Sequence, residues 1–283
     1  MFLFSPSSEQ TFSLTARYCV PYDKARMYLD EQLFKRQGAV NGLERKRTAL
    51  VRRDGTLFLA AFDHPQIYGV MRGLEDPLAA IGALIDTDID GFILNPGIFP
   101  LLDAAVVRDK KLVLRASLGG TMMGTTFADH HSIMASPQQA LDLGADGILI
   151  MMVLGGSKDK ESMTDVARAI EGFHRLSIPV MVEVLHADFS QNNDPAFIRN
   201  GARIAAELGA DFVKAFYCQD FESVVAGCPV PIVLAGGPKE ANILDIAQTV
   251  VRAGASGFAF GRNLFQHEEP TTVVSSLSQI LRR

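Results

Sequence analysis

The chain has 283 residues, of which 48% are hydrophobic and 21% are charged, with a formal net charge of −5. This composition is that of a folded protein with one large core, and the negative charge excludes a global positive field for binding nucleic acid or an anionic membrane surface. The three cysteines are an odd number without metal-type spacing, which predicts reduced thiols rather than disulfides or a zinc site.

The first 50 residues do not follow the pattern of the rest, and we expect an N-terminal extension with a helix near Asp23 to Arg36. Five basic residues between that helix and the first strand are expected to form a solvated linker, with a subunit contact or an anion site as the alternative: Arg45, Lys46, Arg47, Arg52 and Arg53. The opening residues lack a basic segment before a long apolar run, and no later stretch could span a bilayer. We therefore expect a cytoplasmic protein in which residues 51–283 form one domain.

Short apolar runs recur from residue 57 onward. Eight can be counted: Leu57 to Phe62, Gly91 to Asn95, Leu112 to Ser117, Ile148 to Val153, Val180 to Leu185, Phe212 to Tyr217, Ile232 to Ala235 and Gly257 to Phe260. Most are continuous rather than alternating, which is typical of parallel strands that are covered on both faces.

The segments between these runs are typical of helices. The clearest are Asp159 to His174, Pro195 to Leu208, Glu240 to Ala253 and Pro270 to Leu281. Gly144, Gly209 and Gly254 each follow a predicted helix and precede a strand, where glycine adopts the left-handed cap conformation without a Cβ penalty. Eight strands alternating with helices predict a (β/α)8 TIM barrel behind a helical extension, with a doubly wound open sheet as the alternative.

Catalytic side chains of such barrels lie at the C-terminal ends of the strands. The polar residues at those positions are Asp63, His64, Asn95, Arg115, Ser117, Glu183, His186 and Lys214. Other histidines and acidic residues lack ligand-like spacing with this set, so we predict no metal site and no cofactor.

Lys214 lies within an apolar strand, where an unpaired cation would be costly. Burial favours the neutral amine, which can attack a ketone or aldehyde to give an iminium, an electron sink for making or breaking the adjacent carbon–carbon bond. The alternatives are a lysine that extends to solvent at the strand end and a structural ion pair.

Proton transfer has four candidates. Asp63 and His64 follow the first strand, and Glu183 and His186 lie at the fifth. A capping turn is the alternative for Asp63, and alternation along a regular strand places Glu183 and His186 on opposite faces. At most one of these two is therefore expected at the barrel mouth.

The last two strands end in glycines that suit phosphate binding. Gly236, Gly237 and Gly261 permit close approach to backbone N–H groups, and Arg262 could add a bidentate contact. A simple turn is the alternative, but glycines after the last two strands match the usual phosphate position of barrels.

With these residues placed, the sequence from about Leu57 to Gln266 resembles the class I aldolase family that includes archaeal-type fructose-bisphosphate aldolases and the thiolase that degrades phosphorylated autoinducer-2. The resemblance is carried by five segments: Ala61-Phe62-Asp63-His64, Val113-Leu114-Arg115-Ala116-Ser117, Arg203 to Lys214, Val225 to Gly237, and Gly261 to Gln266. It implies a Schiff base on Lys214, acid–base or binding roles for Asp63 and His64, phosphate binding by Gly236, Gly237, Gly261 and Arg262, and a homo-oligomer.

Two departures from the family bear on the substrate. Pro65 stands where the family often has glycine after Asp-His, and the fifth strand lacks the proton-transferring tyrosine of the fructose-bisphosphate aldolases. We therefore predict an aldolase for a phosphorylated ketose or a related phosphorylated carbonyl compound. A thiolase-like or transaldolase-like transferase, a non-catalytic phosphosugar-binding protein and a metal-dependent lyase are the alternatives.

Overall fold

The computed structural model describes residues 41–124, 129–236 and 242–282. They fall within one compact unit that covers Ala39–Arg283. The helix predicted near Asp23 to Arg36 lies outside the described residues.

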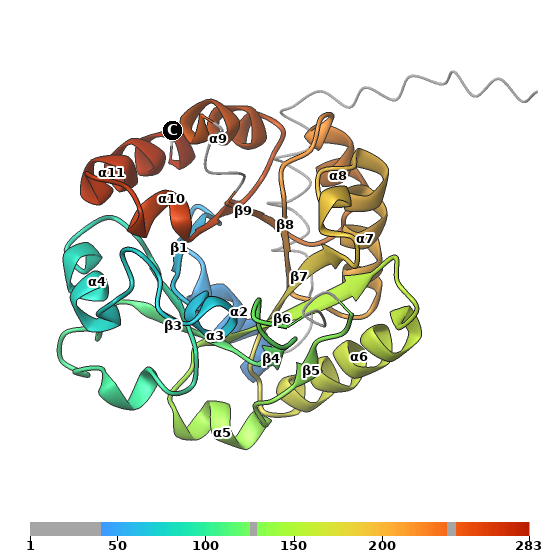
Figure 1. Cartoon of the computed structure of the whole chain (residues 1–283), viewed down its shortest axis with the longest axis horizontal. Helices are drawn as coiled ribbons and strands as arrows, with labels where there is room; N and C mark the ends of the chain where they lie inside the picture. The colour runs from blue at the N-terminus through green and yellow to red at the C-terminus, as the bar shows by residue number, and fades with distance from the viewer. Residues whose placement is uncertain (1–40, 125–128, 237–241, 283) are drawn as a thin grey trace, which may run out of the picture. The chain divides into compact units, whose positions relative to one another are not determined.

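Eight parallel strands form a closed barrel in the described part of the chain (Figure 1). They are β1 (Leu57–Ala61), β2 (Gly91–Leu94), β3 (Lys111–Arg115), β6 (Gly147–Leu154), β7 (Val180–His186), β8 (Phe212–Ala215), β9 (Ile232–Ala235) and β10 (Gly257–Phe260). Each pairs with the next in chain order, and β10 returns to β1 with Leu57 opposite Gly257. This closure confirms the (β/α)8 barrel and excludes the open sheet.

The described helices are α2 (Gly42–Leu50), α3 (Pro65–Tyr68), α4 (Pro77–Leu84), α5 (Pro137–Asp142), α6 (Asp159–Arg175), α7 (Pro195–Glu207), α8 (Phe221–Gly227), α9 (Ile243–Arg252), α10 (Arg262–Phe265) and α11 (Pro270–Leu281), with short 3-10 turns at Phe99–Leu101 and Phe189–Gln191. The longer ones, such as α4, α6, α7 and α11, surround the barrel, whereas α2 and α3 project over its interior in this view (Figure 1). Within the described ranges, no helix has the length and apolar character needed to cross a membrane.

The expected basic linker is solvated, as predicted, but residues 42–50 of it form a helix rather than a linker. α2 begins at Asn41, whose side chain accepts a hydrogen bond from the backbone N–H of Glu44 at 2.8 Å. Its last residue, Leu50, is buried in the cluster inside the barrel, and a Cβ on Gly147 would lie 3.2 Å from it. Burial of Leu50 fixes the end of α2 to the barrel. Arg45, Arg52 and Arg53 nevertheless remain exposed.

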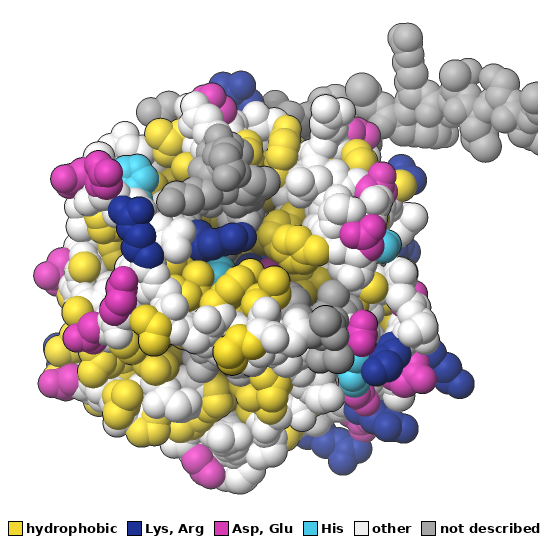
Figure 2. Space-filling model, in the orientation of Figure 1, with side chains coloured by type: hydrophobic (Ala, Val, Ile, Leu, Met, Phe, Trp, Pro, Cys, Tyr) yellow, Lys and Arg dark blue, Asp and Glu magenta, His cyan; other side chains and the backbone are white. Residues whose placement is uncertain are grey.

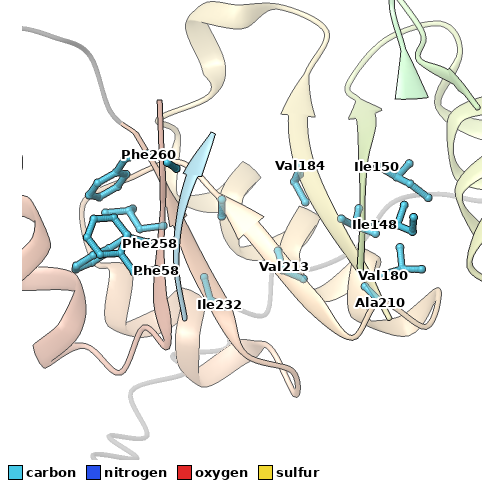
Figure 3. Packing of buried hydrophobic residues seen from close by; sticks show 14 of the residues in the cluster. Phe58, Ile148, Ile150, Val180, Val184, Ala210, Val213, Ile232, Phe258 and Phe260 are labelled. Carbon is cyan, nitrogen blue, oxygen red and sulfur yellow. The ribbon is translucent and has the colours of Figure 1, made fainter. Parts of the chain in front are cut away.

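Alternation along the strands separates two apolar layers. Inward side chains such as Leu59, Leu149 and Val233 fill the barrel, while outward ones pack beneath the helices. Figure 3 shows part of the outer layer, in which Phe58 and Phe258 pack edge to face with ring centroids 5.6 Å apart. The direction of each side chain in a strand therefore follows from its position in this alternation.

The helix-to-strand joints adopt the predicted conformation. Gly144, Gly209 and Gly254 have φ angles of 70°, 103° and 98°, in the left-handed region. An aspartate follows each of the first two glycines and binds a backbone amide. Asp146 accepts a hydrogen bond from Leu112 N at 2.8 Å, and Asp211 accepts one from Val180 N at 2.8 Å. Each carboxylate thus holds the backbone near the start of a neighbouring strand.

Candidate active site

Lys214 points into the barrel. In β8, Phe212 belongs to the inner cluster and Val213 and Ala215 to the outer one, so alternation directs Lys214 inward. The residue is 4% exposed, and its Nζ lies 3.0 Å from Oε2 of Glu183, which is equally buried. A lysine that extends to solvent is therefore excluded. The buried amine has a carboxylate partner that can accept its proton.

Glu183 and His186 take opposite directions, as alternation predicts. Glu183 lies in register with Lys214 on the neighbouring strand and faces the interior. His186 lies at the end of β7 with its ring 4.7 Å from that of Phe197 in α7. The structure therefore brings Glu183 to the site and leaves His186 outside it.

Asp63 forms a second buried pair, with Arg115. Nη1 of Arg115 donates to Oδ2 of Asp63 at 2.7 Å, and its Nε donates to the carbonyl of Ser117 at 3.0 Å. Arg115 is fully buried and Asp63 is 2% exposed. Burial alone would raise the pKa of Asp63, but Arg115, His64 and Lys214 together lower it to about 2.

The sequence placed Arg115 at a strand end but gave it no role. The signal was available, because an arginine within an apolar strand needs a partner as much as a lysine does. What the sequence could not supply was the identity of that partner, since Asp63 lies 52 residues earlier in the chain.

His64 lies beside Asp63 at the start of α3. Its Nδ1 is 3.6 Å from Oδ1 of Asp63, and its ring packs against Phe265 at 5.4 Å. Burial lowers the pKa of His64 to about 4; Asp63 opposes this shift, while Lys214, Arg262 and Arg115 reinforce it. At neutral pH the imidazole is therefore uncharged.

Two of the other strand-end polar residues bind backbone groups. Nδ2 of Asn95 donates to the carbonyl of Asp63 at 2.9 Å, and Oγ of Ser117 accepts from Met151 N at 2.9 Å. Ser117 belongs not to β3, as predicted, but to an added antiparallel hairpin of β4 (Ser117–Leu118) and β5 (Ser132–Ile133). The first contact holds the backbone of Asp63, and the second ties the segment just after Arg115 to β6.

Gly236 and Gly261 lie next to each other at the ends of β9 and β10. A Cβ built on Gly236 would lie 3.8 Å from the backbone nitrogen of Gly261 and 3.1 Å from Nδ2 of Asn263, a buried amide that the sequence did not single out. A Cβ on Gly261 would come within 2.3 Å of Cε1 of His64. Glycine is therefore required for the imidazole to occupy its position.

Arg262 and Gly237 are the other two residues predicted to bind phosphate, and only Arg262 is among the described residues. Arg262 is the first residue of α10 and is partly buried. Gly237 lies outside the described residues. The view along the barrel in Figure 2 shows Lys or Arg and His side chains in a hollow, with hydrophobic side chains beside them.

The arrangement therefore combines an amine paired with a carboxylate, a carboxylate held ionised by a guanidinium, a neutral imidazole, and closely packed glycines near a further arginine. Such a set can form and protonate an imine and bind an anionic group. In the three described ranges, no cluster of three or more His, Cys, Asp or Glu side chains is arranged to hold a metal ion.

Comparison with known proteins gives a family match over most of this fold. The model of the DeoC/LacD family aldolases matches residues 57–267. The 3-hydroxy-5-phosphonooxypentane-2,4-dione thiolase of Klebsiella pneumoniae is 30% identical over 226 residues, which are 79% of this chain and 75% of that protein. The predicted resemblance is confirmed.

Two further relatives extend the comparison. The 2-amino-4,5-dihydroxy-6-oxo-7-(phosphonooxy)heptanoate synthase of Streptomyces griseus is 28% identical over 235 residues, covering 80% of this chain and 84% of that protein. A solved Schiff-base-forming fructose-1,6-bisphosphate aldolase superposes with a TM-score of 0.76 at 25% identity, covering 85% of this chain and 100% of that one.

Proposed function

The chain belongs to the DeoC/LacD family of aldolases, and from this premise we propose that Lys214 forms a Schiff base with a phosphorylated ketose or a related phosphorylated carbonyl compound. The observation that carries the proposal is the pair of Lys214 Nζ and Glu183 Oε2, 3.0 Å apart inside the barrel. A catalytic amine needs a nearby group that takes its proton before attack and returns it afterwards.

The proposed reaction begins when Glu183 takes a proton from the ammonium of Lys214. The free amine attacks the substrate carbonyl to give a carbinolamine, which accepts a proton from Glu183 and loses water to give an iminium. Cleavage of the neighbouring carbon–carbon bond releases an aldehyde as a hydroxyl proton is removed, and the electron pair enters the iminium to give an enamine. Protonation of the nucleophilic carbon of the enamine regenerates an iminium. Addition of water to this iminium then releases the ketone and restores the lysine.

Asp63 and His64 divide the remaining work according to their charges. Asp63, with its pKa lowered to about 2, is a permanent negative charge that can stabilise the cationic iminium. His64, with its pKa lowered to about 4, is neutral at pH 7 and can accept the substrate hydroxyl proton. Arg115 fixes Asp63 in place and keeps it ionised.

The phosphate of the substrate is assigned to the ends of β9 and β10. Gly236, Gly237 and Gly261 would present backbone N–H groups, and Arg262 would add its guanidinium. The close approach of Gly236 to Gly261 supports this assignment, because it brings the backbone at the ends of β9 and β10 together.

Thiolase-like acyl transfer or transaldolase-like exchange is the second candidate. The inward side chains of β7 are Met181, Glu183 and Leu185, so the strand offers no tyrosine for the proton transfer of fructose-bisphosphate cleavage. One relative is named a thiolase. A product that forms only when an acceptor such as coenzyme A is added would favour this candidate.

Borohydride trapping tests the proposal directly. Incubation with a panel of phosphorylated ketoses and sodium borohydride should add the reduced substrate to Lys214, located by peptide mass spectrometry, and EDTA should leave the yield unchanged because the proposed chemistry uses no metal. Lys214→Ala should lose the adduct and the turnover. Lys110→Ala is the matched control, since Nζ of Lys110 is a partly buried structural donor to the carbonyls of Thr87 and Ile89 at 2.9 Å. Full turnover of Lys214→Ala would refute the proposal.

A cytoplasmic homo-oligomer completes the proposal. Sedimentation of the purified full chain at micromolar concentration would measure the oligomeric state, and a monomer would contradict this part alone.

A further inference from the structure

The inner wall of the barrel beyond Lys214 is apolar on the side of β6 and β7. Met151 lies opposite Glu183 in the ladder, and Val153 lies opposite Leu185, two residues nearer the C-terminal ends of both strands. Met151, Val153 and Leu185 form a separate buried cluster, distinct from the cluster inside the barrel and from the one beneath the helices. This cluster therefore starts at the level of Glu183 and continues toward the mouth.

Phe216 extends this wall from the next strand. It lies two residues beyond Lys214, is partly buried, and packs against the cluster together with Ala187. Its ring contacts that of Phe189 at 5.9 Å, and Phe189 is 51% exposed at the rim. Hydrophobic side chains beside the cationic ones are visible in the hollow of Figure 2.

Charge is distributed unequally around the lysine. His64, Gly261 and Arg262 lie together on the side of β1 and β10, as the contact that a Cβ on Gly261 would make with the imidazole shows. On the other side, the side chains of Val153, Leu185 and Phe216 offer no hydrogen bond. A substrate whose phosphate lies near Arg262 and whose carbonyl reaches Lys214 would direct its remaining end toward this wall.

We propose that this wall, defined by Met151, Val153, Leu185 and Phe216, selects substrates that carry a hydrocarbon group, such as a methyl, on the carbonyl carbon at the end remote from the phosphate. The inference rests on the proposed Schiff base at Lys214 and adds the substrate class. A second phosphate at that end would be desolvated without a free cation, because Arg115, which donates to Sδ of Met151 at 3.0 Å, already pairs with Asp63. A hydroxymethyl group would lose hydrogen bonds to water that the wall does not replace.

Three five-carbon compounds that differ only at this end provide the test. All carry the carbonyl at carbon 2 and the phosphate at carbon 5: 1-deoxy-D-xylulose 5-phosphate ends in a methyl, D-xylulose 5-phosphate in a hydroxymethyl, and D-xylulose 1,5-bisphosphate in a second phosphate. The measurement is the concentration of each that gives half-maximal borohydride trapping on Lys214. We expect this concentration to be about 10-fold lower for the methyl compound than for the hydroxymethyl compound, and the bisphosphate to give no saturation.

Variants of the wall should reduce the preference. Val153→Thr keeps the shape and adds a hydroxyl, and Phe216→Ser removes the half-buried ring, so each should bring the methyl-to-hydroxymethyl ratio to about 3-fold or less. Phe197→Ser is the matched control, because Phe197 is also partly buried but packs against His186 outside the barrel. This control should keep the wild-type ratio.

The possible failures are distinguishable. Equal trapping of the methyl and hydroxymethyl compounds on Lys214 of the wild type, or an unchanged ratio in both wall variants, would overturn the apolar selection and leave the Schiff base intact. Adducts on Lys214 with other phosphorylated ketoses but with none of these three compounds would overturn the selection alone. Absence of any adduct on Lys214 across the whole panel would overturn the proposed function, and the selection with it.

Discussion

The two ends of the barrel satisfy their buried charges in different ways. At the N-terminal end, Asp90, Asp146 and Asp211 bind backbone N–H groups of neighbouring strands, and Lys110 binds two backbone carbonyls. The side-chain partners at this end are partly exposed: Arg52 and Arg282 pair with Asp90, and His174 with Asp211. At the C-terminal end, Asp63 pairs with Arg115 and Glu183 with Lys214, side chain to side chain.

This difference separates structure from chemistry. A carboxylate that binds backbone amides joins two neighbouring strands and stabilises the fold. An ion pair buried among apolar residues instead has a desolvation cost that its attraction only partly offsets. Such pairs are retained where a reaction needs charges in place before the substrate arrives. The comparison predicts that variants at the mouth and at the other end have different consequences.

Arg115→Met should have the largest effect on stability. It leaves Asp63 buried and unpaired, which should lower the free energy of unfolding by about 3–5 kcal/mol in urea titrations at pH 7. Adding Asp63→Asn should recover most of this loss, because neither charge then remains. If Arg115→Met alone is as stable as the wild type, Asp63 does not depend on Arg115 to remain buried as a charged group.

Glu183→Gln should reduce turnover and leave the fold largely intact. The amide is similar in shape but cannot take the proton of Lys214, so kcat should fall by about 10²–10³-fold, with trapping slowed to a similar extent. The matched variant at the other end is Asp146→Asn, which should keep kcat within about 2-fold. Similar kcat losses in both variants would remove the distinction between the two ends.

Asp211→Ala should affect stability alone. It removes the acceptor for Val180 N and for Nε2 of His174, both at 2.8 Å. The unfolding free energy should fall by about 1–3 kcal/mol, while kcat/KM per folded molecule stays unchanged. Activity measured on the folded fraction provides the check, and a lost activity at full stability would contradict a structural role.

The smallest predicted effect is a pH dependence from His64. Its pKa is about 4 in the folded protein against 6.5 for the free group, so the unfolded state binds more protons between these values. Stability is complete above pH 6.5 and should fall by about 1 kcal/mol between pH 7 and pH 5.5. His64→Gln should abolish this part of the loss in urea titrations at the two pH values.

Much of the fold could be predicted from the sequence because its signals are local. Continuous apolar runs indicated the eight strands, and Gly144, Gly209 and Gly254 marked joints that only a left-handed residue completes. Lys214 was found for the same reason, since one charged residue within an apolar strand is visible without knowledge of the neighbouring strands. The hairpin of β4 and β5 was missed because two-residue strands leave no periodic pattern.

Pairing between strands was decided only by the tertiary structure. Barrel closure and register place Glu183 beside Lys214 and Arg115 beside Asp63, residues that are 31 and 52 positions apart in the chain. The sequence supplied the residue types and the inward or outward direction, because side chains alternate along any strand. Distances between charges, and with them the pKa values of Asp63 and His64, exist only once the strands close, since interaction energy and desolvation depend on separation and burial in space.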